Sequence, residues 1–160
     1  MKNSWIFPGQ ASQKIGMGKD LYDKTEIGKK YYKTANEILE VDIQSISFNG
    51  PEEVLKKTKY TQPAIFIVSV IIGHTMIEKG YAPDIVAGHS LGEYSALVVS
   101  GAFDFSTGLE LVKLRAESMQ NAGKVNRGTM AAIIGLSSDD VNNLCCLLYT
   151  SDAADEGLGV

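Results

Sequence analysis

The sequence of 160 residues has few of the residue types that mark specialised classes of protein. It contains 2 cysteines, and because Cys145 and Cys146 are adjacent, we expect free thiols rather than a disulfide or a structural zinc site. It has no run of basic residues, and its net charge is -4. A nucleic-acid partner is therefore not expected.

Long hydrophobic runs are also absent. The longest, Ala64 to Ile72, is interrupted by Ser69 and is about half as long as a bilayer-spanning helix. Pro8 and Gly9 end the N-terminal apolar stretch before a secretory signal could form. With 44% hydrophobic and 21% charged residues, the composition is that of an ordinary globular protein, and we expect it to be cytoplasmic, without a membrane segment.

Strand and helix signals alternate along the chain, which predicts an α/β fold with parallel strands. The expected strands are Trp5–Phe7, 84–88 and Thr129–Gly135. The expected helices are residues 10–58 for the most part, 63–79, a segment ending at Gly101, 105–121 with Asp104 as N-cap and Gly123 as stop, and one starting at Asp139 after Ser137 or Ser138. Since three strands cannot cover that many helices, we expect the fold in this chain to be incomplete.

A nucleophile motif follows the second predicted strand. Gly88-His89-Ser90-Leu91-Gly92 matches G-x-S-x-G, in which a serine occupies a strained turn between a strand and a helix. The predicted nucleophile is Ser90, and the amide of Leu91 can donate to an oxyanion at the positive end of the following helix. The structural alternative is an ordinary strand-to-helix turn.

The sequence offers only two histidines as a base for this serine. His89 adjoins Ser90, and its side chain should point away from the serine side chain. His74 lies on an apolar helix, where a structural role with a backbone carbonyl as partner is the commoner case. Neither histidine is expected to complete a catalytic dyad.

Five ordered motifs between about Ser4 and Leu144 resemble the malonyl-CoA:acyl carrier protein transacylases of bacterial fatty acid synthesis. They are Phe7-Pro8-Gly9-Gln10, Thr61-Gln62-Pro63-Ala64, Gly88 to Leu97, the Arg115 segment, and Gly128 to Leu136. The resemblance implies transfer of a malonyl group from malonyl-CoA, through a serine ester, to the phosphopantetheine thiol of acyl carrier protein. It implies no metal and no bound cofactor, because coenzyme A enters as a thioester substrate.

The resemblance also assigns roles to individual residues. It makes Ser90 the acylated nucleophile, and it makes the amides of Leu91 and Gln10 the two halves of the oxyanion hole. It pairs Arg115 with the malonyl carboxylate, which suits a guanidinium because its fork binds a carboxylate through two hydrogen bonds. Gln62 and His89 are weaker substrate-binding candidates, and Gln62 could equally cap the start of a helix.

The chain departs from the family pattern at two places. Ala11 stands where the family usually has glycine, which puts the backbone path beside Gln10 in question. The family's histidine base and the glutamine or asparagine that orients it would lie well beyond Arg115, and this sequence has neither. We therefore expect an N-terminal fragment that is weakly active or inactive.

The resemblance implies an incomplete α/β-hydrolase-like core with the start of a ferredoxin-like small subdomain. We expect the core over residues 1–124, the start of the subdomain over 125–145 and a non-native tail over 146–160. The segment from Cys146 to Glu156 departs from the helical pattern and resembles the translation of a sequencing adapter.

Two other functions remain open from the sequence. The elbow alone would fit a serine esterase or thioesterase, which would lack a use for Arg115. A non-catalytic module that binds acyl carrier protein is the other alternative. Binding to that acidic partner would need basic residues near the site, and Lys113, Lys124 and Arg127 are candidates.

Overall fold

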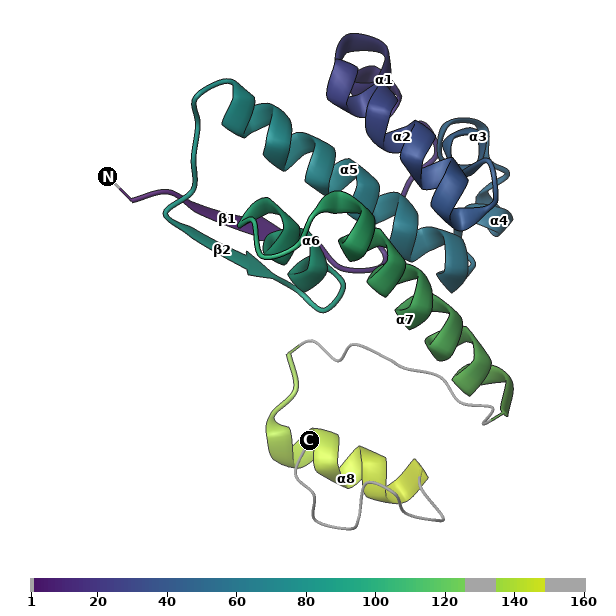
Figure 1. Ribbon diagram of the computed structural model, residues 1–160. Helices are drawn as coiled ribbons and strands as arrows, with labels where there is room; N and C mark the ends of the chain where they lie inside the picture. The colour runs from purple at the N-terminus through teal and green to yellow at the C-terminus, as the bar shows by residue number, and fades with distance from the viewer. Residues whose placement is uncertain (1, 126–134, 149–160) are drawn as a thin grey trace. The chain divides into compact units, whose positions relative to one another are not determined.

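The computed structural model describes residues 2–125 and 135–148, which fall in two compact units, Met1–Asn126 and Arg127–Val160. The elements of the first unit are β1 (Ser4–Phe7), α1 (Lys19–Lys24), α2 (Glu26–Leu39), α3 (Ile43–Asn49), α4 (Glu52–Leu55), α5 (Thr58–Glu78), β2 (Ile85–Gly88), α6 (Gly92–Val99) and α7 (Phe105–Val125) (Figure 1). The second unit contains α8 (Ser138–Leu148). The described chain is mixed α/β and mostly helical, so the predicted class is confirmed.

Helix α5 forms the centre of the first unit. It packs against α7, α6 and α2, and Figure 1 shows α7 running alongside it. The fully buried α5 residues are apolar on nearly every side of the helix, which is why no amphipathic pattern marked it. They include Ala64, Phe66, Ile67, Val70 and Ile71.

Helix α5 is longer than the apolar run within it. Although its longest uninterrupted apolar run is short, the whole 21-residue helix is long and apolar enough to cross a membrane by length and composition. Within the first unit, however, 61% of its apolar window is buried inside the protein. The expected position of this segment in the core is confirmed.

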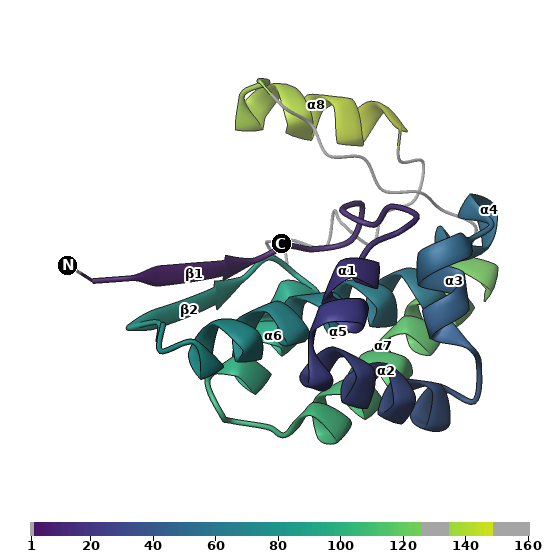
Figure 2. The ribbon, with the colours of Figure 1, turned by 90° about the horizontal axis from the view of Figure 1, so that it is seen from above.

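Strands β1 and β2 pair in parallel, with Ile6 opposite Ala87 and Phe7 opposite Gly88. Their side chains alternate between the two faces, as the pleat requires. Trp5, Phe7 and Val86 pack with residues of α6 on one face, and Figure 2 shows α6 beside the two strands. On the other face Ile6 is 78% exposed, so this face is apolar and uncovered within the first unit.

Two helix ends differ from the prediction. Helix α5 begins at Thr58, one turn before Pro63, because the Lys57 carbonyl accepts hydrogen bonds from the amides of Tyr60 and Thr61 and closes an earlier turn. Helix α7 continues past Gly123 to Val125. An exposed glycine lowers helix propensity by about 1 kcal/mol but ends a helix only where the backbone turns left-handed.

The predicted caps are confirmed at two helices. The Asp104 carboxylate accepts a hydrogen bond from the Thr107 amide at 2.7 Å, which holds the pKa of Asp104 below its ordinary value. Ser137 accepts from the Asp140 amide at 3.2 Å at the start of α8. The predicted strand Thr129–Gly135 lies outside the described residues except for Gly135.

Helix α8 also corrects the interpretation of the tail. The helical pattern was expected to stop at Cys146, but α8 continues to Leu148. The reason is local, because Cys146 and the two leucines after it contain no helix breaker. Cys145 and Cys146 are free thiols, as predicted.

Candidate active site

The turn between β2 and α6 has the strained geometry that the G-x-S-x-G motif predicts. Ser90 has a positive φ of 52°, a conformation that costs a residue with a side chain free energy. A Cβ on Gly88 would overlap the backbone of Gly92 and Glu93, and one on Gly92 would overlap the carbonyl of Phe7. Both glycines are therefore required by close approach of the backbone, and Ser90 is left exposed at the carboxyl end of β2.

The loop after β1 lies directly against this turn. The His89 amide donates to the Phe7 carbonyl at 3.0 Å, so the elbow continues the pairing of the two strands. Because parallel strands end at the same edge of a sheet, residues after Phe7 and after Gly88 meet there. This pairing brings Gln10 into the site although it is far from Ser90 in the sequence.

The backbone amides of Leu91 and Gln10 are the candidate oxyanion donors at this edge of the sheet. Among the described residues, the amides of Leu91 and Gln10 donate to no protein acceptor. Leu91 is the N-cap residue of α6, where the helix dipole favours negative charge. The pair can act as an oxyanion hole for an intermediate formed on Ser90.

Arg115 on α7 contacts the serine side chain. Its Nη2 donates to Ser90 Oγ at 2.9 Å, and its Nη1 donates to Gln62 Oε1 at 2.7 Å. The guanidinium carbon lies 5.9 Å from the centre of the Tyr94 ring, which adds a cation–π contact. A fixed cation beside a nucleophile can hold the free carboxylate of an acyl group.

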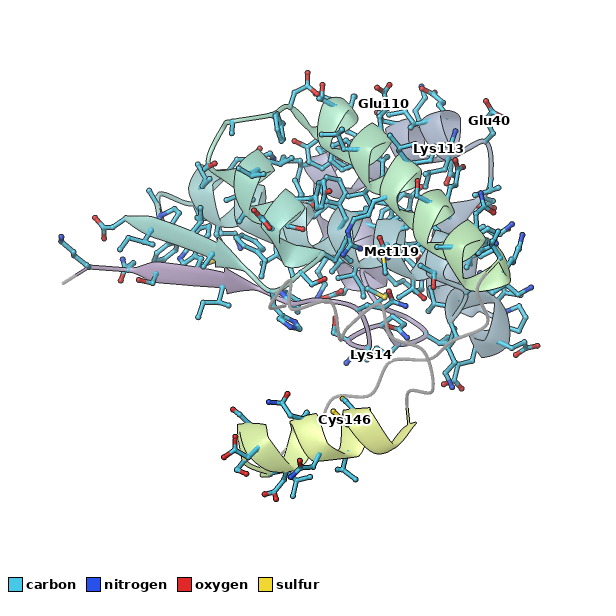
Figure 3. The ribbon with its side chains drawn as sticks, turned by 90° about the horizontal axis from the view of Figure 1, so that it is seen from below. Lys14, Glu40, Glu110, Lys113, Met119 and Cys146 are labelled. Carbon is cyan, nitrogen blue, oxygen red and sulfur yellow. The ribbon has the colours of Figure 1, made fainter. Side chains whose placement is uncertain are left out.

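Gln62 joins Arg115 to the loop after β1. Its side chain is fully buried, and its Nε2 donates to Gln10 Oε1 and to Met119 Sδ, each at 3.3 Å. Figure 3 shows Met119 on α7. The alternative role for Gln62 as a cap at the start of a helix is wrong, because it lies one turn inside α5.

Neither histidine contacts the nucleophile. His74 Nδ1 lies 2.7 Å from the Tyr31 hydroxyl. Burial lowers the pKa of His74. Its partner is the Tyr31 hydroxyl on α2 and not the backbone carbonyl expected from the sequence. His89 is exposed, and its ring lies against Gly9 rather than on Ser90.

Two residues of this site, Tyr94 and Met119, were not predicted from the sequence. Tyr94 follows Ser90 by four positions and Met119 follows Arg115 by four positions. Arg115 and Met119 share one face of α7, so helical spacing could have identified Met119, whereas Ser90 precedes α6 and gives no such signal for Tyr94.

Lys113 forms its hydrogen bond with α2 and not with the nucleophile. Its Nζ donates to the Ile38 carbonyl at 2.9 Å, near the C-terminal end of α2, and Figure 3 shows it beside Glu40. A cation is favourable at that end of a helix dipole. Lys113 therefore stabilises the end of α2, which weakens the case for it as a docking residue.

The site brings together a strained serine elbow and an arginine hydrogen-bonded to the serine, an arrangement suited to accepting an acyl group. The family model of the acyl transferase domain matches residues 4–146, and the chain belongs to that family. The malonyl CoA-acyl carrier protein transacylase of Synechocystis sp. is 48% identical over 134 residues, covering 84% of this chain and 44% of the relative.

Two solved structures share the fold. The malonyl CoA-acyl carrier protein transacylase from Coxiella burnetii matches with a TM-score of 0.84 and 37% identity over 92% of this chain and 47% of that one. A malonyl-transacylase in complex with its type II PKS acyl-carrier protein matches with a TM-score of 0.80 and 38% identity over 92% of this chain and 48% of that one. The chain spans about half the length of the curated relatives it matches.

Proposed function

We propose that this chain carries the acyl-accepting part of a malonyl-CoA:acyl carrier protein transacylase. The observation that supports this most directly is the 2.9 Å hydrogen bond from Arg115 Nη2 to Ser90 Oγ. It places a cation that can recognise a carboxylate beside a serine that can accept an acyl group. The named activity of the relatives and the carrier-protein complex among the related structures agree with this function.

The proposed reaction has two acyl transfers at Ser90. The serine oxygen attacks the malonyl thioester carbonyl, the amides of Leu91 and Gln10 stabilise the oxyanion, and the C–S bond breaks as coenzyme A leaves as a thiol with the serine proton. The phosphopantetheine thiol of acyl carrier protein then attacks the ester. Its proton returns to Ser90 and a new thioester forms, so no metal or cofactor is consumed.

Arg115 would select the acyl group. The malonyl carboxylate replaces Ser90 Oγ as the acceptor of Nη2 and frees the hydroxyl for attack. An acetyl group has no carboxylate, so it would leave the arginine without this partner. We propose His89, which is exposed beside Ser90 in the sequence, as a weaker contact to substrate.

The finer architecture belongs to the same proposal. The two strands and the helices around them correspond to part of an α/β-hydrolase-like core over residues 1–124, and 125–145 begins a ferredoxin-like subdomain. The tail proposed for residues 146–160 would begin inside the last turn of α8, which includes Cys146. We propose a cytoplasmic location, where malonyl-CoA and the carrier protein would both be accessible.

The test is acylation of the purified chain. After incubation with malonyl-CoA, intact-mass and peptide mass spectrometry should find a malonyl ester on Ser90, formed faster than the acetyl ester from acetyl-CoA. Among the described residues no histidine or carboxylate hydrogen-bonds Ser90. We therefore expect slow acylation, since loss of the base costs triad enzymes several orders of magnitude.

Two serine variants serve as controls. Ser90→Ala should abolish the ester, whereas Ser118→Ala, which changes an exposed serine on α7, should leave its rate unchanged. Equal rates from the two thioesters would contradict selection by Arg115 and favour a serine esterase or thioesterase. Absence of any ester, with carrier-protein binding retained, would favour the non-catalytic module.

A further inference from the structure

A buried side chain connects the arginine of the site to the loop that carries the oxyanion amide. Gln62 lies on α5, Arg115 on α7, and Gln10 on the loop after β1. The hydrogen bonds run from Ser90 Oγ to Arg115, on to Gln62 Oε1, and from Gln62 Nε2 to Gln10 Oε1. Three segments of the chain therefore meet at one amide group.

The chemistry of its neighbours fixes the orientation of the Gln62 amide. A guanidinium can only donate, so it must face the amide oxygen. The Gln10 oxygen and the Met119 sulfur can accept, so they face the amide nitrogen. Since Gln62 is fully buried, water cannot replace these partners, and a flipped amide would leave buried groups without hydrogen bonds.

We infer that Gln62 is a positioning residue that holds Arg115 over Ser90 and couples carboxylate recognition to the Gln10 loop. The inference rests on the proposed function and deepens it. Arg115 would otherwise be a long side chain with a half-exposed guanidinium and many accessible rotamers. Holding Nη1 on Gln62 leaves Nη2 free to exchange Ser90 Oγ for the carboxylate of the acyl group.

The primary test measures Arg115 directly in the isolated chain. Gln62→Met keeps the size of the side chain and removes the amide oxygen and nitrogen of residue 62. In this variant NMR should find that the Arg115 guanidinium rotates about tenfold faster, as expected for loss of a hydrogen bond to a charged group. Gln62→Glu keeps the acceptor oxygen and should leave the rotation as slow as in the unchanged chain. Gln44→Met on α3 makes the same change away from the site and should have no effect.

Acylation provides the second readout. The ratio of malonyl to acetyl ester formation on Ser90 should fall about tenfold in Gln62→Met. It should also fall in Gln62→Glu, because a carboxylate at residue 62 would compete with the malonyl carboxylate for Arg115. If Gln62→Met does not fold, Gln62→Ala, which also removes the acceptor oxygen of Gln62, gives the same test of guanidinium rotation and of the ester ratio.

The outcomes separate the inference from the proposed function. Unchanged guanidinium rotation in Gln62→Met, or equal losses for both acyl groups, would overturn the positioning role. If the unchanged chain forms neither ester, the proposed function fails, and the rotation measurement still decides whether Gln62 holds Arg115. Faster rotation together with a lower malonyl ratio is the result that supports both.

Discussion

Single residues at this site hold conformations or contacts that their type does not favour. Ser90 and Ala11 both have positive φ, at 52° and 83°. At Ser90 the strain exposes the hydroxyl at the end of the sheet, which the proposed nucleophile requires. Ala11 has no such chemistry, and its conformation explains why glycine is the expected residue at this position in the family pattern.

Replacing Ala11 with glycine should stabilise the protein. A left-handed conformation costs alanine roughly 1 to 2 kcal/mol, and glycine would avoid this cost. The greater freedom of glycine in the unfolded chain offsets part of the resulting stabilisation. We expect Ala11→Gly to raise the free energy of unfolding by about 0.5 to 1 kcal/mol, measured by urea denaturation. The matched control is Ala122→Gly on an exposed part of α7, which should lower it by a similar amount.

Replacing Arg115 with lysine should impair selection of malonyl over acetyl groups. Lysine retains the positive charge but lacks the fork that bonds Gln62 and Ser90 together. We expect the ratio of malonyl to acetyl ester formation to fall at least about tenfold in Arg115→Lys. If charge alone were sufficient, the ratio measured by mass spectrometry would stay the same.

At the scale of whole elements, the local patterns were predicted well and the long-range contacts were not. The elbow at Ser90 and the caps at Asp104 and Ser137 depend on a few consecutive residues, so the sequence reveals them. The meeting of Arg115 with Gln62 joins positions 53 residues apart and depends on how α5 packs against α7. No sequence spacing encodes that packing, which is why the role of Gln62 stayed open.

The helix boundaries show the same limit. Pro63 fits the first turn of a helix, but hydrogen bonds to the Lys57 carbonyl add a turn before it. The strand Thr129–Gly135 stays a prediction because it lies outside the described residues. Propensity identifies where an element is possible, and contacts with its neighbours decide where it ends.

The contact of His74 with Tyr31 links α5 to α2 and should make stability depend on pH. Burial lowers the pKa of His74 from 6.5, although the nearby Glu78 carboxylate acts in the opposite direction. Below about pH 6.5 the unfolded chain therefore binds a proton more readily than the folded one. The free energy of unfolding should fall from pH 6.5 toward the lower folded pKa and be independent of His74 above that range.

This dependence can be measured in a His89→Gln background, in which His74 is the only histidine. Urea denaturation between pH 5 and 8 should give falling stability on the acidic side, and His74→Gln should remove that component. NMR titration of the His74 ring gives an independent measurement of the pKa of His74. A His74 pKa above 6.5 would contradict the expected sign.

Across the first unit as a whole, one face of the small sheet is an exposed apolar surface. Parallel sheets are normally covered on both faces, and here one face packs on α6 while Ile6 and Ile85 are 78% and 55% exposed on the other. Beside β1 an apolar groove of about 520 Å³ extends to α5. Burying this surface would gain roughly 25 cal/mol for each Å² removed from water.

We expect the isolated chain to self-associate through this face. Sedimentation and light scattering should show species larger than a monomer that increase with concentration, together with binding of a hydrophobic dye. The double variant Ile6→Thr and Ile85→Thr should shift the distribution toward monomer, because threonine keeps strand propensity and removes apolar area. Leu114→Thr changes a residue that is 62% exposed on α7 and not on the sheet, and should leave association unchanged. A concentration-independent monomer before any substitution would show that the open face is not a site of association.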